Sequence, residues 1–287
     1  MHDIRAKSIL GPQSGLGMNL YRGCTHGCIY CDSRSTCYQF DHSFTDVAVK
    51  INAPELLEME LRKKRKPCMI GTGSMCDPYL PIEKELLLTR RCIERIERYG
   101  FGLALLSKSA TLLRDIDLFT SIQARAKCVI QMTLTTFDPA LNAIVEPNVS
   151  STQERIEALA ALQKAGIPTV VWLSPILPFL NDTKDNIEKL LDACVSVGVQ
   201  GIMCFGMGVT LRDGSRDYFY QQLDRRFPGM KLKYQKAFGN AYVCNSPNHD
   251  ALMRLFTDTC ERRGILHEPD AVFSYLRAFP EQQLRLF

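Results

Sequence analysis

The sequence lacks several features that would place it in a specialised class of protein. No apolar run approaches the roughly 18 consecutive residues that a membrane-spanning helix needs, so we expect no membrane partner. The opening residues MHDIRAKSIL contain no apolar segment and no cleavage signal of a secretory leader. There is also no internal repeat and no low-complexity tract. We therefore expect a soluble cytoplasmic protein.

The sequence also lacks a large excess of charge of one sign, because its formal net charge is only +4. The densest basic run is Arg62 to Lys66. Proteins that grip a nucleic-acid backbone concentrate cations in this way, but such a run is more often the solvated end of a helix. The charge alone therefore does not indicate a nucleic-acid partner.

Cysteine, in contrast, is abundant, with 12 residues in a chain of 287. Disulfide-rich scaffolds are short secreted domains, whereas this chain is long enough to bury one large core. We therefore expect reduced thiols and one α/β domain as the basic architecture.

From residue 54 onward, stretches with helical periodicity alternate with short apolar, β-branched runs, which is typical of parallel βα units. The pattern predicts helices at 54–66, 82–99, 111–123, 152–165, 183–197 and 215–226. It predicts buried strands at 18–21, 68–73, 101–107, 128–136, 168–174 and 201–208. Six units favour an open or partial (β/α)6 barrel over a complete barrel of eight. We expect this core to span residues 1–226, with residues 227–287 as a C-terminal extension packed on it.

Three cysteines, Cys24, Cys28 and Cys31, lie in the segment YRGCTHGCIYC, just after the first predicted strand. In parallel α/β folds, the loops that follow strands carry the active site. Three thiolates on one loop can ligate three irons of a cubane cluster and leave the fourth iron open to another ligand. A structural zinc site is the alternative, and Cys37 or His26 would then complete four closed ligands.

The spacing Cys-x3-Cys-x2-Cys, with the aromatic Tyr30 before the last cysteine, resembles the cluster motif of the radical S-adenosylmethionine (radical SAM) superfamily. Together, the segments RGCTHGCIYC, GTGSMCDPYLPIE, LLSKS and SPILPFLNDT resemble the spore photoproduct lyase-like branch, also called DNA repair photolyase-like. The resemblance covers roughly residues 18–205. It implies the partial TIM-type barrel of that superfamily.

The resemblance also implies two cofactors, a [4Fe–4S] cluster and S-adenosylmethionine (SAM), which react to give a 5′-deoxyadenosyl radical. Cys24, Cys28 and Cys31 would hold the cluster. Lys108 would contact the SAM carboxylate, and the glycine-rich strand end would receive its ammonium group. The full set of implied cofactor-binding residues is Tyr30, Gly71, Thr72, Gly73, Ser74, Asp77, Lys108, Thr133 and Ser174.

Cys76 is the candidate catalytic thiol, because lyases of this branch keep a hydrogen-donating cysteine in a similar segment. Its alternative is a small buried core residue, which is the commonest fate of a free cysteine. Cys244, among polar and aromatic residues of the extension, is a second thiol of interest. Asp32 stands where the lyases carry a second tyrosine, which weighs against repair of a thymine lesion.

The resemblance implies a nucleic-acid substrate for lyase-type DNA repair, and a flavodoxin- or ferredoxin-type electron donor. Cations and aromatics mix in residues 231–242, as in a nucleic-acid groove or in an ordinary amphipathic covering. Modification of RNA or a peptide is the second reading. A zinc-stabilised nucleic-acid-binding protein without catalysis is the alternative from another class.

Overall fold

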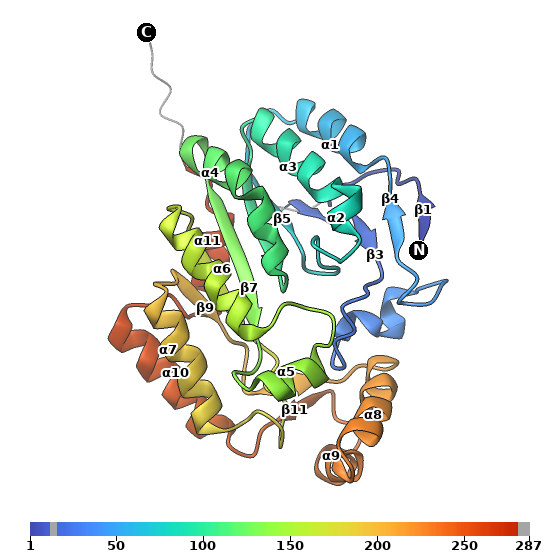
Figure 1. Ribbon diagram of the computed structural model, residues 1–287, viewed down its shortest axis with the longest axis vertical. Helices are drawn as coiled ribbons and strands as arrows, with labels where there is room; N and C mark the ends of the chain where they lie inside the picture. The colour runs from blue at the N-terminus through green and yellow to red at the C-terminus, as the bar shows by residue number, and fades with distance from the viewer. Residues whose placement is uncertain (12–15, 281–287) are drawn as a thin grey trace.

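The structure is a computed structural model that describes residues 1–11 and 16–280. Within these residues a parallel sheet of six strands forms the centre of the molecule, in the order β2-β5-β6-β7-β8-β9 (Figure 1). The strand order follows the chain order, and the sheet stays open between β2 and β9, which confirms the partial α/β barrel. The strands are Leu16–Met18 (β2), Met69–Thr72 (β5), Gly102–Ser107 (β6), Cys128–Leu134 (β7), Thr169–Leu173 (β8) and Gly201–Met203 (β9).

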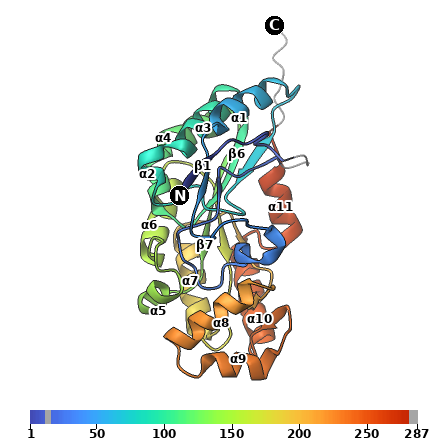
Figure 2. The ribbon, with the colours of Figure 1, turned by 90° about the vertical axis from the view of Figure 1, so that its right-hand side faces the viewer.

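Helices follow the strands along the chain and cover the outer face of the sheet. Figure 2 shows α3, α4 and α6 on one side of the strands and α11 on the other. The covering helices are Ala53–Arg62 (α1), Leu88–Arg98 (α3), Ile116–Arg125 (α4), Thr152–Lys164 (α6), Lys184–Ser196 (α7) and His249–Arg263 (α10). No helix in the described ranges is long and apolar enough to cross a membrane.

Three of the predicted helices are confirmed within about two residues, as α6, α7 and α8 (Ser215–Arg226). Helix α1 ends at Arg62, because the basic run after it turns away from the helix before Pro67. The helix predicted at 111–123 begins as a 3-10 segment, Ala110–Asp115, before α4.

Three predictions from the sequence were wrong. The strand predicted at 201–208 ends at Met203, and Gly208 begins a separate strand, β10 (Gly208–Thr210), in another sheet. The helix predicted at 82–99 is two helices, α2 (Glu83–Leu86) and α3, because Leu87 between them has a left-handed backbone. The strand predicted at 18–21 is also divided. Met18 ends β2, whereas Tyr21–Arg22 forms β3, which pairs with β4 (Ala48–Lys50) and, through β4, with β1 (His2–Ile4). Met18, Leu20 and Tyr21 are all buried, so the apolar pattern does not mark where the chain leaves one sheet for another.

The alternation along β7 shows how the open barrel is filled. Ile130, Met132 and Leu134 face the outer helices in the main core. Val129 lies on the inner face, where it packs with residues of α11 (Pro269–Arg277) in a separate apolar cluster. Helix α11 therefore plugs the amino ends of the inner face and leaves space at the carboxyl ends.

The remaining elements surround that space. Helix α5 (Pro139–Val145) lies in the crossover between β7 and α6, and β10 (Gly208–Thr210) pairs antiparallel with β11 (Val243–Asn245). Between β10 and β11 the chain forms α8 and α9 (Met230–Phe238). Helix α10 packs beside α7 (Figure 1). Residues 227–280 thus supply a helix beside the core, a strand and the plug, while residues 281–287 lie outside the described part of the chain.

Candidate functional site

The cysteine loop, residues 23–31, begins directly after β3. Its start is fixed where the Cys24 amide donates to the Phe44 carbonyl at 2.9 Å. Cys28 is buried and Cys24 and Cys31 are partly buried, yet all three line one cavity of about 400 Å³. One short loop therefore presents three thiols to a single space.

The end of β5 forms the next wall of the cavity. Gly73 has φ +98°, and a Cβ added there would lie 1.9 Å from the Leu106 carbonyl oxygen, so only glycine fits. The chain then turns and brings Ser74 and Cys76 to the cavity. Gly71 and Thr72 lie inside β5 and are not among the described residues that line the cavity.

Asp77 connects three loops around the cavity. One carboxylate oxygen accepts from the Ser107 hydroxyl at 2.7 Å and from the Tyr79 amide at 2.8 Å. The other accepts from the Lys108 amide at 2.7 Å and lies 3.6 Å from Nδ1 of His26 in the cysteine loop. Because both oxygens have protein partners, the geometry favours a positioning role for Asp77.

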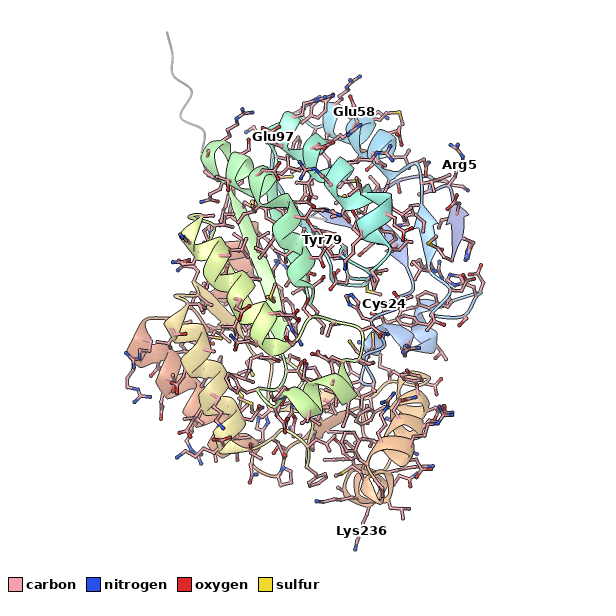
Figure 3. The ribbon with its side chains drawn as sticks, viewed as in Figure 1. Arg5, Cys24, Glu58, Tyr79, Glu97 and Lys236 are labelled. Atoms are coloured by element: carbon pink, nitrogen blue, oxygen red, sulfur yellow. The ribbon has the colours of Figure 1, made fainter. Side chains whose placement is uncertain are left out.

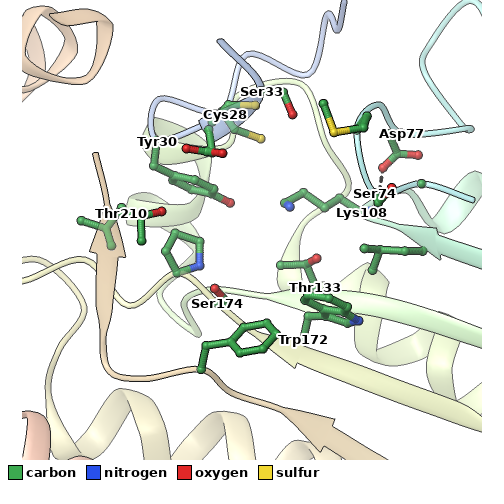
Figure 4. Close-up of a pocket in the computed structure, with 18 of the residues that line it drawn as sticks. Cys28, Tyr30, Ser33, Ser74, Asp77, Lys108, Thr133, Trp172, Ser174 and Thr210 are labelled. Atoms are coloured by element: carbon green, nitrogen blue, oxygen red, sulfur yellow. Dashed lines mark hydrogen bonds between the residues drawn. The ribbon is translucent and has the colours of Figure 1, made fainter. Parts of the chain in front are cut away.

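The far wall comes from the ends of β6, β7 and β8. Lys108 extends its amino group into the cavity (Figure 4), with Nζ 5.9 Å from the centre of the Tyr30 ring. Thr133, Trp172 and Ser174 also line the cavity. Thr133 and Trp172 share the inner face of neighbouring strands, as their register in the sheet requires.

An aromatic and polar rim borders the cavity on the side of β10 and β11. Phe205 is 61% exposed there, and its ring packs edge-on against Trp172 with centroids 5.8 Å apart. Thr210, Val243 and Asn245 line the same side. The sequence analysis missed this rim, although an aromatic followed by two glycines, Phe205 before Gly206 and Gly208 in CFGMG, is a signal that the buried strand ends there.

Two thiols at the cavity are electrostatically linked. A hydrogen bond from Cys76 is the largest cause that lowers the pKa of Cys24, to about 6, against the opposing effect of burial. Cys76 also lies 2.8 Å from the Gly23 carbonyl oxygen. Its one proton can serve either acceptor, but not both together. The pKa of Cys28 is raised, chiefly by burial.

The two residues considered as a fourth ligand have other neighbours. Cys37 is exposed, with its sulfur 3.9 Å from the Arg212 guanidinium. His26 lines the cavity but faces Asp77. In Figure 3, the partly buried Cys24 lies well away from the exposed Lys236 of α9.

The structure thus brings together most of the residues singled out from the sequence. Those that line the one cavity are Cys24, Cys28, Tyr30, Cys31, Gly73, Ser74, Cys76, Asp77, Lys108, Thr133 and Ser174. Cys244 is buried below the rim.

Comparison with known proteins places this geometry in a family. The model of the radical SAM superfamily matches residues 18–194, which is more than half of the chain. A protein of Mycobacterium bovis, described as uncharacterized, is 30% identical over 252 residues, covering 83% of this chain and 73% of that protein. A radical SAM Nα-GlyT isomerase of Pseudomonas phage M6 is 27% identical over 175 residues, covering 61% of this chain and 35% of the isomerase.

Among solved structures, a mutant of spore photoproduct lyase with bound AdoMet and dinucleoside spore photoproduct has a similar fold. The TM-score is 0.63 with 15% sequence identity, and the match covers 93% of this chain and 80% of the lyase. The likeness to the lyase, first suggested by the sequence, is confirmed at the level of the fold. By its family model and its fold, the chain belongs to the radical SAM superfamily, whose cofactors are a [4Fe–4S] cluster and SAM.

Proposed function

We propose that Cys24, Cys28 and Cys31 hold the [4Fe–4S] cluster and that the chain cleaves SAM reductively in the cavity they line. The observation that carries this proposal is the meeting of three thiols with the carboxyl ends of three neighbouring strands around one cavity. When bound together, the cluster and SAM supply a 5′-deoxyadenosyl radical. The protein binds and orients the cofactors and excludes water from them. As part of the same proposal, a flavodoxin- or ferredoxin-type protein donates the electron that reduces the cluster.

The residues around the cavity fit this assignment chemically. Three cysteines match three irons and leave one iron free for SAM. At Gly73 a side chain would collide with the Leu106 backbone, so glycine lets the two strand ends pack closely at the wall of the cavity. Lys108 provides a cation for a carboxylate, and Thr133 and Ser174 provide hydroxyls on the facing wall.

Other residues contribute through position. Tyr30 borders the cavity next to the third cysteine, and Lys108 lies beside its ring. Ser74 lines the cavity near Asp77, whose hydrogen bonds hold the Lys108 backbone in place. Gly71 and Thr72 support the strand end from below the cavity.

For the substrate, we favour a nucleic acid and a lyase-type repair of a DNA photoproduct. An exposed aromatic ring, Phe205, stands at the cavity mouth, where a base can stack. Nearby, the Arg212 guanidinium lies 5.3 Å from the Tyr242 ring centre and gives the outer rim a cation. Cys76, which lines the cavity close to Cys24, is the candidate hydrogen donor to a product radical. RNA or a peptide is the alternative substrate.

The first experiment tests cluster and cleavage together in protein purified without oxygen. After dithionite reduction, wild type should release 5′-deoxyadenosine and methionine from SAM, measured by chromatography. Cys31→Ala should lose most of its iron and all cleavage because a cluster ligand is missing. Cys37→Ala is the matched control and should keep both.

Equal loss of iron in Cys31→Ala and Cys37→Ala would sink the assignment of three ligands. A fully loaded wild type that binds SAM but never releases 5′-deoxyadenosine would sink the cleavage itself. Wild type should also turn over an oligonucleotide that carries the spore photoproduct. If it ignores that lesion while still cleaving SAM, DNA repair is wrong and RNA and peptide substrates are next.

A further inference from the structure

The connection between α5 and α6 is hydrogen-bonded to the cysteine loop at several points along the loop. The Ile29 amide donates to the Val145 carbonyl at 3.0 Å. At the other end, the Asn148 amide donates to the His26 carbonyl at 3.1 Å, and its side chain donates to the Thr25 carbonyl at 2.9 Å. The loop therefore has a partner segment far away in the sequence that satisfies its backbone groups.

A buried carboxylate stands at the centre of this connection. Glu146 is 1% exposed and accepts hydrogen bonds from the Tyr30 hydroxyl and from the Thr135 hydroxyl at 3.1 Å. Its second oxygen accepts from the Asn142 amide group at 2.8 Å and pairs with Arg155, which is fully buried in α6. Every oxygen of the carboxylate is thus used within the protein.

The environment keeps Glu146 charged. Burial alone would raise its pKa, but the positive charges of Arg155 and Lys108, with hydrogen bonds from Tyr30 and Arg155, hold the pKa at about 2. An ionised carboxylate accepts a stronger, shorter hydrogen bond than a neutral group does. The Tyr30 hydroxyl therefore has one strongly favoured partner, and the Tyr30 ring, between Cys28 and Cys31 in the loop, has one favoured position.

A buried ion pair contributes little net stability, because the cost of desolvating its charges offsets most of their attraction. Apolar residues of the same volume would fill α6 equally well, since Arg155 lies on the buried stripe with Ala158, Leu159 and Leu162. A charged pair instead constrains geometry, because its hydrogen bonds form only in particular directions. Here Glu146 accepts from the Tyr30 hydroxyl, and Arg155 donates to the Thr133 carbonyl of the cavity wall.

We propose that Glu146 and Arg155 are positioning residues that hold Tyr30 and so fix the cysteine loop in its ligating shape before any cofactor binds. The proposal rests on the proposed function, because it assigns the loop to the cluster. The pair acts through Tyr30 and touches neither the cofactor nor the substrate. Loosening it frees the loop while the barrel stays folded.

The test measures the opening of the loop in cofactor-free protein. Cys28 is only 7% exposed on the cavity wall, so iodoacetamide should modify it slowly, at a rate that rises when the loop opens locally. Mass spectrometry gives the rate for each cysteine. Glu146→Gln removes the charge and should raise the rate at Cys28 about tenfold. Cys92, fully buried in α3, should stay unreactive and reports that the fold is intact.

Tyr30→Phe gives a second, milder variant because it leaves the ion pair in place. It should also raise the Cys28 rate, and adding Tyr30→Phe to Glu146→Gln should raise it little further. Asp115→Asn is the matched control. Asp115 is equally buried and also joins a tyrosine, Tyr79, to arginines, but none of its hydrogen bonds reaches the cysteine loop. It should leave the Cys28 rate unchanged.

Iron uptake provides the second readout. With limiting iron and sulfide, Glu146→Gln should retain less iron than Asp115→Asn does. The proposal is wrong if Asp115→Asn opens Cys28 as much as Glu146→Gln does, or if Tyr30→Phe leaves the rate unchanged. The Tyr30→Phe result is decisive even if Glu146→Gln does not fold, which reaction of Cys92 with iodoacetamide would reveal. A wild type that takes up no iron would overturn the proposed function and leave the alkylation result standing.

Discussion

At the scale of single residues, the cavity combines reactive side chains with side chains that hold them. Cys76 belongs to the first kind in our proposal, since its thiol lies on the cavity wall beside Cys24. Asp77 and Glu146 belong to the second, since each carboxylate accepts hydrogen bonds from several segments. The reactive groups are thereby presented at an open space while their supports stay buried.

Replacing Cys76 separates a hydrogen donor from a packing residue. Cys76→Ala should still form 5′-deoxyadenosine but should uncouple it from clean product, because the product radical finds no thiol hydrogen atom. Trapped adducts on the lesion-containing oligonucleotide, detected by mass spectrometry, are the measurement. Cys76→Ser is the control, because its hydroxyl keeps a hydrogen bond to the Gly23 carbonyl and yields a hydrogen atom far less readily than a thiol.

If Cys76→Ser restores clean turnover, the thiol acts only by hydrogen bonding. If Cys76→Ala itself recycles SAM and repairs the lesion as wild type does, the residue is core filler. The search would then pass to another thiol.

The sequence located the residues that line the cavity better than the buried residues that support them. Lys108 and Ser174 each stand just after a strand of the parallel sheet, and the ends of parallel strands meet at one edge. Cys24 instead follows β3, which belongs to the separate sheet with β4. Glu146 follows a helix that the sequence analysis did not predict. Arg155 did carry a signal, because a charged residue on a buried helical stripe requires a buried partner. The sequence does not reveal which residue that partner is.

At the scale of elements, tertiary contacts override local preference where α2 gives way to α3. The run ELLLTR is made of good helix formers, which is why one helix was predicted across it. The structure instead places the Thr89 amide on the Glu83 carboxylate at 3.0 Å and the Thr89 hydroxyl on the Pro78 carbonyl at 2.6 Å. Leu87 takes a left-handed conformation with φ 49° so that both bonds can form.

Leu87→Gly should therefore be tolerated better than glycine at a helical position nearby. A left-handed leucine costs about 1–2 kcal/mol, and glycine removes that cost, although it adds some unfolded-state entropy. Leu87 is 39% exposed, so glycine also loses the apolar area that the rest of the side chain buries. Because these effects offset one another, we expect the free energy of unfolding in urea to change by less than about 0.5 kcal/mol.

Leu86→Gly is the matched control, since Leu86 is the last residue of α2 and is helical. It should cost about 1 kcal/mol. An equal loss of stability in the two variants would mean that the backbone at Leu87 carries no relievable strain.

At the scale of the whole molecule, we retain the proposal of a core in residues 1–226 with an extension from residue 227. The extension is tied to the core at several places. Phe256 of α10 is buried in the main core, Val272 of α11 packs on the inner face of the sheet, and Val243 borders the cavity. A unit so distributed should unfold together with the barrel.

Phe256→Ala tests this cooperativity. Truncating a fully buried phenylalanine should cost about 3–5 kcal/mol, and circular dichroism and tryptophan fluorescence should still report one coincident transition. The only tryptophan, Trp172, lies in β8, and its ring also packs against Phe273 of α11, so it reports on the barrel and on that helix. Leu232→Ala in α9, at a side chain 70% exposed, should change stability by less than about 0.5 kcal/mol. Two transitions in Phe256→Ala that do not coincide between circular dichroism and fluorescence would show that part of the extension unfolds separately from the barrel.

The rim formed by Phe205, β10 and β11 has a consequence for how this scaffold can change over evolutionary time. The cysteine loop is bound by hydrogen bonds to the α5–α6 connection, so substitutions there disturb many partners at once. The rim is different, since Phe205, Val243 and Asn245 are exposed and make fewer contacts with the core. Descendants of this chain can therefore acquire new substrates by drift at these positions, whereas Met207, Val209 and Cys244 between them are buried. A combinatorial library confined to Phe205, Thr210, Val243 and Asn245, which line the cavity, is the shortest route to retargeting it.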